Sequence, residues 1–139
     1  MKTDQDFMRL AGCIITDKQG RILLLHRNTD AWQHWEIPGG KVEVDEDPKA
    51  TAIREIKEEL GVNVEIKKLL GQRAFAEKDY MLHYTWYQAQ IVKGKVKIME
   101  PEIFDDASYL SREEMYSVTL STGAQTFLAM LETVEVSIK

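Results

Sequence analysis

The segment from Asp47 to Gly61 constrains this chain more than any other, because both of its ends carry helix-boundary signals. An aspartate side chain can cap the first turn of a helix, and Pro48 would stand where its missing N–H costs nothing. Gly61 can adopt the left-handed conformation in which many helices end. The sequence therefore predicts a helix over 48–60.

This helix is predicted to have two chemically different faces. At about 100° per residue, Glu58 lies about −60° and Glu59 about +40° from Glu55, so the three carboxylates share one face. Three aliphatic residues lie roughly opposite them: Ile53, Ile56 and Leu60. Most glutamate-rich helix faces are simply solvated, but clustered carboxylates are also the ligands that Mg²⁺ prefers. The backbone of Pro38-Gly39-Gly40, just before the helix, is open to close approach by a cation or a phosphate.

Residues 40–62 fit the pattern G-x5-E-x7-R-E-U-x-E-E-x-G-U at every position, where U is a bulky aliphatic residue. This is the Nudix box, and the chain resembles the Nudix hydrolase family, in particular its MutT-like members. The preceding segment 35–39 and the order of the expected strands are also similar to the family. The resemblance implies a single domain over 1–139 with an α/β (α+β) fold, in which a mixed β-sheet lies between helices on both faces, as an α/β/α sandwich.

The resemblance also implies roles for individual residues of the box. Glu58 and Glu59 match the principal metal ligands, and Glu55 matches a position that serves as a ligand or as the general base. The carbonyl of Gly39 matches a backbone ligand. Arg54 and Glu46 match a supporting ion pair that orients the carboxylates. The implied cofactor is Mg²⁺, with Mn²⁺ as a substitute.

Residues outside the box give further candidates. Some family members take the base from a later loop, and the acids here are Glu100, Glu102, Asp105 and Asp106. His26 and Arg27 lie where related enzymes place basic substrate-binding residues. Tyr80 lies about where dinucleoside-polyphosphate hydrolases of the family place a tyrosine. Each of these residues also has an ordinary structural interpretation, and we interpret His34 and His83 as structural.

The remaining chain predicts strands before and after the helix. Alternating and apolar runs predict strands over 8–16 and 21–27, joined as a hairpin at Gly20, and longer strands over 62–75 and 80–92. Shorter strands are expected over 95–99 and 107–110. Ser111 and Glu114 have the spacing of a capping box, which predicts a short helix, and 122–134 has helical periodicity.

Composition limits the partners. A formal net charge of −5 argues against nucleic-acid and membrane-surface binding, because both favour a basic face. The single cysteine, Cys13, excludes an intramolecular disulfide and fits a buried strand position. The polar segment 1–6 predicts no signal peptide, and no apolar run could cross a bilayer, so we expect a cytoplasmic protein.

The predicted function is Mg²⁺-dependent hydrolysis of a phosphoanhydride bond in a nucleoside diphosphate-linked compound. The favoured reaction is that of a nucleoside triphosphate pyrophosphatase of the MutT or 8-oxo-dGTP type, which releases a monophosphate and pyrophosphate. The alternatives are a dinucleoside polyphosphate hydrolase and an ADP-ribose or nucleotide-sugar hydrolase. From another class, a non-catalytic nucleotide-sensing module stays open. The expected partner is a small-molecule nucleotide, and the expected assembly is a monomer or homodimer.

Overall fold

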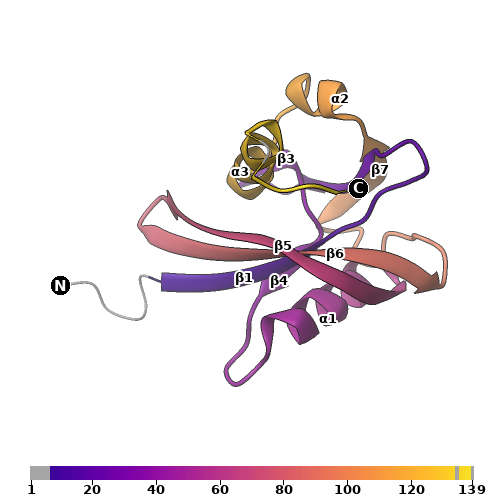
Figure 1. Cartoon of the computed structure of the whole chain (residues 1–139), viewed down its shortest axis with the longest axis horizontal. Coiled ribbons are helices and arrows are strands. Elements are labelled where there is room, and N and C mark those ends of the chain that lie inside the picture. The colour runs from indigo at the N-terminus through magenta and orange to yellow at the C-terminus, as the bar shows by residue number, and fades with distance from the viewer. Residues whose placement is uncertain (1–6, 134, 139) are drawn as a thin grey trace.

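The computed structural model describes residues 7–133 and 135–138, which form two small sheets and three helices (Figure 1). In chain order the elements are β1 (Phe7–Ile14), β2 (Ile22–Asn28), β3 (Gln33–Glu36), β4 (Gly39–Lys41), α1 (Pro48–Leu60), β5 (Asn63–Glu77), β6 (Tyr80–Lys93), β7 (Phe104–Leu110), α2 (Arg112–Tyr116) and α3 (Thr122–Glu132). The segment 1–6, used to predict the absence of a signal peptide, lies outside the described residues, as does residue 134 of the expected last helix.

The strands divide between a four-stranded sheet in the order β4-β1-β6-β5 and a three-stranded sheet in the order β3-β2-β7. The larger sheet is mixed, because β1 runs parallel to β6 while the other neighbours are antiparallel. Helix α1 lies on one side of this sheet and α3 on the other (Figure 1). The predicted arrangement of a mixed sheet between helices is therefore confirmed.

The hairpin predicted between the first two strands is wrong, because β1 and β2 belong to different sheets. The chain does turn near Gly20, where Thr16 and Ile22 form an isolated bridge. Beyond this bridge the strands diverge, and each becomes an inner strand of its own sheet. The last four residues of β1 and the first four of β2 are buried on both faces. A strand buried on both faces has other elements packed above and below it. β1 and β2 meet this condition as inner strands of separate sheets, which an isolated hairpin would not.

Helix α1 has the predicted boundaries. The Asp47 side chain accepts a hydrogen bond from the N–H of Lys49, and Pro48 occupies the first helical turn. Gly61 ends the helix with φ of 70°. The capping box at Ser111 is also present, with Glu114 donating its N–H to the Ser111 hydroxyl and accepting from the Ser111 N–H.

Two local predictions differ from the structure. Pro38-Gly39-Gly40, expected to be irregular, leads into strand β4, because Gly39 and Gly40 pair with Gly12 and Ala11 of β1. The strand expected over 95–99 is absent from the described chain. Instead, the N–H groups of Lys97 and Met99 donate to the last carbonyls of α1, those of Leu60 and Glu59. The segment therefore caps the helix rather than joining a sheet.

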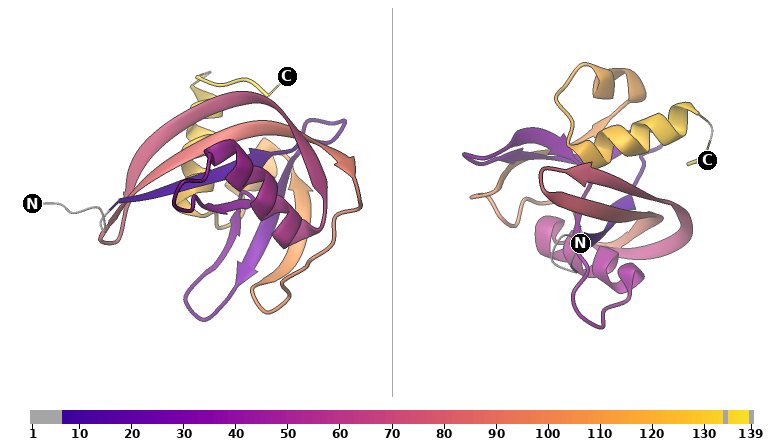
Figure 2. Two further views of the ribbon diagram at one scale, coloured as in Figure 1. Left: turned by 90° about the horizontal axis from the view of Figure 1, so that it is seen from below. Right: turned by 90° about the vertical axis from the view of Figure 1, so that its left-hand side faces the viewer.

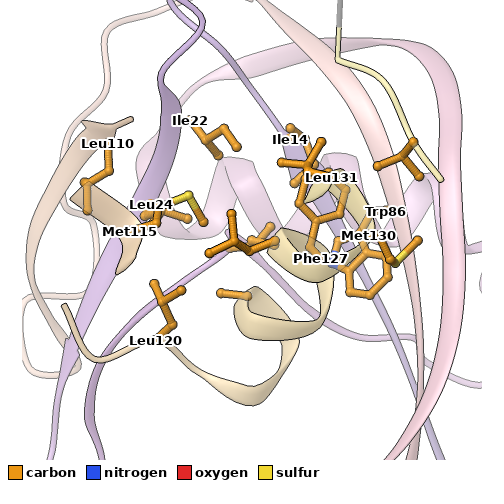
Figure 3. Packing of buried hydrophobic residues seen from close by; sticks show 14 of the residues in the cluster. Ile14, Ile22, Leu24, Trp86, Leu110, Met115, Leu120, Phe127, Met130 and Leu131 are labelled. Atoms are coloured by element: carbon orange, nitrogen blue, oxygen red, sulfur yellow. The ribbon is translucent and has the colours of Figure 1, made fainter. Parts of the chain in front are cut away.

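Each side of the larger sheet carries an apolar core. The core on the α3 side includes Trp86, Phe127 and Leu131, whose side chains meet between the two sheets (Figure 3). The core on the α1 side includes Ile56, Leu60 and Cys13, the last buried as predicted. The long β5–β6 hairpin is strongly curved, as Figure 2 shows, and its register shifts three times. The helices within the described residues are all too short or too polar to span a membrane.

Candidate active site

The three glutamates of α1 do not share one environment. Glu58 is exposed, Glu55 is partly buried, and Glu59 is only 4% exposed. The Oε1 atom of Glu59 accepts a hydrogen bond from the N–H of Gly39 at 3.1 Å. The helix wheel placed Glu59 on the acidic face, but it lies at the edge of that face nearest Ile56, where the helix meets the sheet. Conversely Ile53, expected to be buried, is 36% exposed.

Arg54 joins the helix to the preceding loop through carboxylates on both. Its Nε donates to Glu46 at 2.8 Å and its Nη2 donates to the other Glu46 oxygen at 3.0 Å. Hydrogen bonds from Arg54, and then from Thr51, lower the pKa of Glu46 to about 2. The ion pair expected between Arg54 and Glu46 is therefore present. The Nη1 atom of Arg54 also contacts Glu55 at 3.1 Å and Glu58 at 3.2 Å, so one guanidinium orients three acids.

Two glycines of strand β4 allow close approach, Gly40 to helix α1 and Gly39 to strand β1. A Cβ atom on Gly40 would lie 2.3 Å from the Cδ atom of Glu55, and one on Gly39 would lie 2.4 Å from the carbonyl oxygen of Ala11. Any other residue at these positions would displace the carboxylate or the strand. The Gly39-Gly40 backbone is therefore the surface against which Glu55 and Glu59 are held.

Negative charge exceeds positive charge around this backbone. Burial, followed by the like charges of Glu36 and Glu55, raises the pKa of Glu59 well above its ordinary value. Burial also raises the pKa of Glu55, with the charge of Glu58 adding to it and that of Arg54 opposing it. Glu100 contributes to both shifts. Each carboxylate is thus harder to ionise because others surround it.

The donor set fits a divalent cation chemically. Within 7–133 and 135–138, no three acidic, histidine or cysteine side chains already converge in the geometry of a metal site. Crowded carboxylate oxygens with raised pKa values are nevertheless the hard ligands that Mg²⁺ selects, and a cation would relieve their repulsion. Glu55, Glu58 and Glu59 would hold it, and the ligand role of the Gly39 carbonyl stays a prediction.

A pocket of about 300 Å³ opens on the other side of Gly39 and Gly40. Aromatic side chains from three elements or loops line it: Trp32, Phe75 and Tyr84. Its polar wall is formed by Glu36, which accepts hydrogen bonds from Arg27 at 2.6 Å and from His34 at 2.9 Å. Although burial opposes ionisation, these bonds from His34 and Arg27 lower the pKa of Glu36. The Glu36 carboxylate and the Arg27 guanidinium therefore place a negative and a positive charge side by side in this wall.

The basic candidates of β2 separate in the structure. Arg27 lines the pocket, as expected of a substrate-binding residue, and its guanidinium also lies over the ring of Phe104 at 4.9 Å. His26 points to the other face, where its Nδ1 lies 2.7 Å from Asp105 and its ring packs on Trp35. Successive residues of a strand face opposite sides, so only one of the pair can reach the pocket. Tyr80 is 45% exposed and is not among the residues that line the pocket.

The four acidic candidates of the later segment also differ in their partners and exposure. Asp105 is held by His26 and Asn28, and Asp106 accepts from the N–H of Ala107. Glu102 is exposed. Glu100 is partly buried, and its charge acts on both Glu55 and Glu59. Of these four acids, Glu100 is therefore the one whose charge acts on both Glu55 and Glu59.

Glu36 was not predicted as a pocket residue, Tyr84 was not singled out among the aromatic residues, and His34 was interpreted as structural. The sequence did contain a signal for Glu36 and His34, because the two residues are two positions apart in a strand and must share a face. No such signal existed for Tyr84, whose neighbours in the pocket come from distant parts of the chain.

The model of the NUDIX domain family matches residues 6–131. The CMP-5'-(N-acetyl-N-hydroxy-3-aminopropyl)phosphonate hydrolase of Streptomyces rubellomurinus is 41% identical over 108 residues, covering 71% of this chain and 52% of that protein. The 8-oxo-dGTP diphosphatase of Proteus vulgaris is 33% identical over 63 residues, covering 44% of this chain and 56% of that protein.

Among solved structures, the MutT NUDIX hydrolase from Burkholderia pseudomallei has a TM-score of 0.77 at 25% identity, covering 88% of this chain and 96% of that one. The chain spans 30%, 38% and 38% of the first three curated relatives that it matches.

Proposed function

Because the chain belongs to the NUDIX family, whose model spans residues 6–131, we propose that it is a metal-dependent hydrolase of phosphoanhydride bonds. The observation that carries the proposal is the crowding of Glu55 and Glu59, whose pKa values are both raised, beside the Gly39-Gly40 backbone, which lines a pocket. Acids with raised pKa values at the edge of a cavity are typical of catalytic sites. The substrate class is a nucleoside diphosphate-linked compound.

Within this class we favour a nucleoside triphosphate, cleaved to a monophosphate and pyrophosphate. The aromatic side chains of the pocket suit a nucleobase, because a ring can stack on them whatever its edge carries. A base bound there would direct its phosphates across Gly39 and Gly40 toward the carboxylates. A relative named 8-oxo-dGTP diphosphatase supports the triphosphate.

The residues have separable tasks in this reaction. A bound Mg²⁺ or Mn²⁺ would neutralise phosphate charge and lower the pKa of a water molecule. Glu58 and Glu59 would hold the cation, while Arg54 keeps Glu55 and Glu58 oriented. The proton acceptor is Glu55, which lies against Gly40, or Glu100, whose charge acts on Glu55 and Glu59, because a base must lie within reach of the reacting water. In either case the water attacks phosphorus in line and the phosphate-bearing leaving group departs.

A nucleotide panel with Mg²⁺ tests the proposal. It should contain the ribonucleoside and deoxynucleoside triphosphates, 8-oxo-dGTP, a dinucleoside polyphosphate, ADP-ribose and a nucleotide sugar. CTP is of particular interest because one relative is named for a CMP-linked substrate. We expect pyrophosphate and a monophosphate from at least one triphosphate. Binding of a nucleotide without release of any phosphate would instead support a sensing module.

A further inference from the structure

Tyr84 of β6 is held rigidly at the floor of the pocket. Its side chain is largely buried, and its ring stacks on Trp86 with centroids 4.8 Å apart and an angle of 12° between the planes. On another side, a Cβ atom on Gly123 of α3 would lie 3.2 Å from the ring. A ring fixed in this way presents its hydroxyl at one position.

Two glycines make room for that hydroxyl. A Cβ atom on Gly12 or on Gly39 would lie 2.8 Å from the Tyr84 hydroxyl oxygen. The oxygen therefore lies over the paired strands β1 and β4, against Gly12 and against Gly39, whose N–H binds Glu59. This position is where the pocket meets the carboxylates of the box.

The hydroxyl is an unused donor. In the described part of the chain it has no hydrogen-bond partner, although Tyr84 is only 8% exposed. Among the described residues, Trp86 Nε1 is the one side-chain nitrogen or oxygen that is both without a partner and fully shielded from solvent. The Tyr84 oxygen, which also has no partner, must therefore retain some solvent contact. Tyr84 is one of the residues that line the pocket. Burial, and then the charges of Glu36 and Glu59, raise the pKa of Tyr84 well above its ordinary value, so the proton is retained. A buried donor without a partner is unfavourable unless a ligand or a water fills the place.

We infer that the Tyr84 hydroxyl binds the substrate, donating a hydrogen bond to an oxygen of the sugar–phosphate linkage between the base pocket and the carboxylates of α1. The inference rests on the proposed function, because it assumes a nucleotide with its base in the pocket. The Tyr84 hydroxyl can donate a hydrogen bond and so takes an acceptor, and the acceptors of a sugar–phosphate linkage are oxygens. The location beside Gly39 selects the sugar–phosphate linkage rather than the base or the terminal phosphate. Tyr84 is thus a positioning contact for substrate, and not a proton donor in the reaction.

Tyr84→Phe removes the hydroxyl and keeps the ring. Its matched control is Tyr87→Phe, in a tyrosine of the same strand and the same exposure that packs in the core on the α1 side. With the best substrate of the panel, we expect Tyr84→Phe to raise KM about tenfold with little change in kcat, because one hydrogen bond contributes about this factor to binding. Tyr87→Phe should leave both constants unchanged.

Thermal unfolding distinguishes a ligand contact from a structural one. Without nucleotide, Tyr84→Phe should have a Tm equal to or above that of the wild type, because no internal hydrogen bond is lost. With Mg²⁺ and a non-hydrolysable α,β-methylene triphosphate, its Tm should rise less than that of the wild type. An unchanged KM and an unchanged nucleotide-induced shift would overturn the inference, as would a lower Tm without ligand.

The acceptor atom can be identified with sugar-deoxy substrates. If the Tyr84→Phe effect disappears on a 2′- or 3′-deoxy nucleotide, the acceptor is that hydroxyl, and if it persists on both, the acceptor is a phosphate or ring oxygen. Failure of the proposed function would look different: the wild type would hydrolyse no member of the panel. The Tm shift with the methylene analogue would still test the contact in that case.

Discussion

Glu59 shows how one residue can be placed on a helix by sequence and given its chemistry by a distant partner. The N–H of Gly39, twenty positions earlier in the chain, fixes one of its oxygens. The same contact brings the carboxylate into a buried site where Glu36 and Glu55 oppose its ionisation. Glu58, one position earlier, stays exposed and is shared with Arg54. Two adjacent glutamates therefore differ in burial, although each matches one of the two principal ligand positions of the box.

Replacing either ligand should abolish turnover without unfolding the protein. We expect Glu58→Gln and Glu59→Gln to lower kcat by more than about 100-fold, since changes to residues that only support metal ligands already cost 10- to 100-fold. Steady-state kinetics at saturating Mg²⁺ measure this effect, and circular dichroism checks the fold. Glu65→Gln, in an exposed acid paired with Lys67, is the matched control. Near-wild-type turnover in either ligand variant would refute the assignment.

At the scale of elements, the segment between β6 and β7 decides which acid completes the site. Gly94, with φ of 96°, turns the chain after β6, and a Cβ there would lie 3.1 Å from the carbonyl oxygen of Gly61. Lys97 and Met99 then donate their N–H groups to carbonyls at the end of α1. Those carbonyls have no partner within the helix, so docking satisfies them. As a consequence the charge of Glu100, which follows, acts on Glu55 and Glu59 of the same helix.

This docking predicts a difference between two glutamates of the segment. Glu100→Gln should lower kcat by about 100-fold, the scale of general base catalysis, or by a similar factor if the group helps to hold the cation. Glu102→Gln should have little effect, because that side chain is exposed and its charge is not among those that shift the pKa values of Glu55 and Glu59. Parallel kinetics of the two variants measure the difference. Equal losses in both, or none in either, would contradict the role given to the docked segment.

For the whole molecule, the site links stability to pH and to cations. Burial raises the pKa of Glu59 in the folded protein, so its contribution to stability is complete below the unfolded pKa and is lost as pH rises through the folded value. Glu46 has the opposite sign: its pKa of about 2 gives stability that is present above the unfolded value and lost as pH falls toward 2. The two effects occupy different windows, because that of Glu59 lies above about pH 4.5 and that of Glu46 below it.

Thermal unfolding of Glu59→Gln between pH 5 and 8 isolates the first effect. Glutamine can still accept the Gly39 N–H through its carbonyl oxygen but carries no charge. Without divalent cations, the Tm of the variant should exceed that of the wild type increasingly as pH rises. Adding Mg²⁺ should raise the wild-type Tm more than that of the variant, because binding to the folded state stabilises it. Parallel Tm curves in both conditions would show that Glu59 neither resists ionisation nor contributes to cation binding.

Features that depend on neighbours within a few positions could be predicted from the order of the amino acids. The boundaries of α1 follow from the capping chemistry of Asp47, Pro48 and Gly61, which acts over one turn of helix. The spacing of Glu55, Glu58 and Glu59 is part of the box that identifies the family, because the helical repeat places these three residues on one face. The pair of Arg54 and Glu46 was implied by the resemblance to the family, through the fixed positions of both residues in the box.

Features that arise where distant segments of the chain meet could not be predicted and are visible only in the folded protein. Burial on both faces separates β1 and β2 into different sheets, which alternation in the sequence cannot reveal. Sheet register brings the Gly39 N–H to Glu59 and the Tyr84 hydroxyl to Gly12 and Gly39. Docking of the loop before β7 determines which of the four later acids acts on the box, namely Glu100. The physical reason is that local preferences fix an element's type and ends, whereas packing between elements fixes which of its side chains are buried and what they contact.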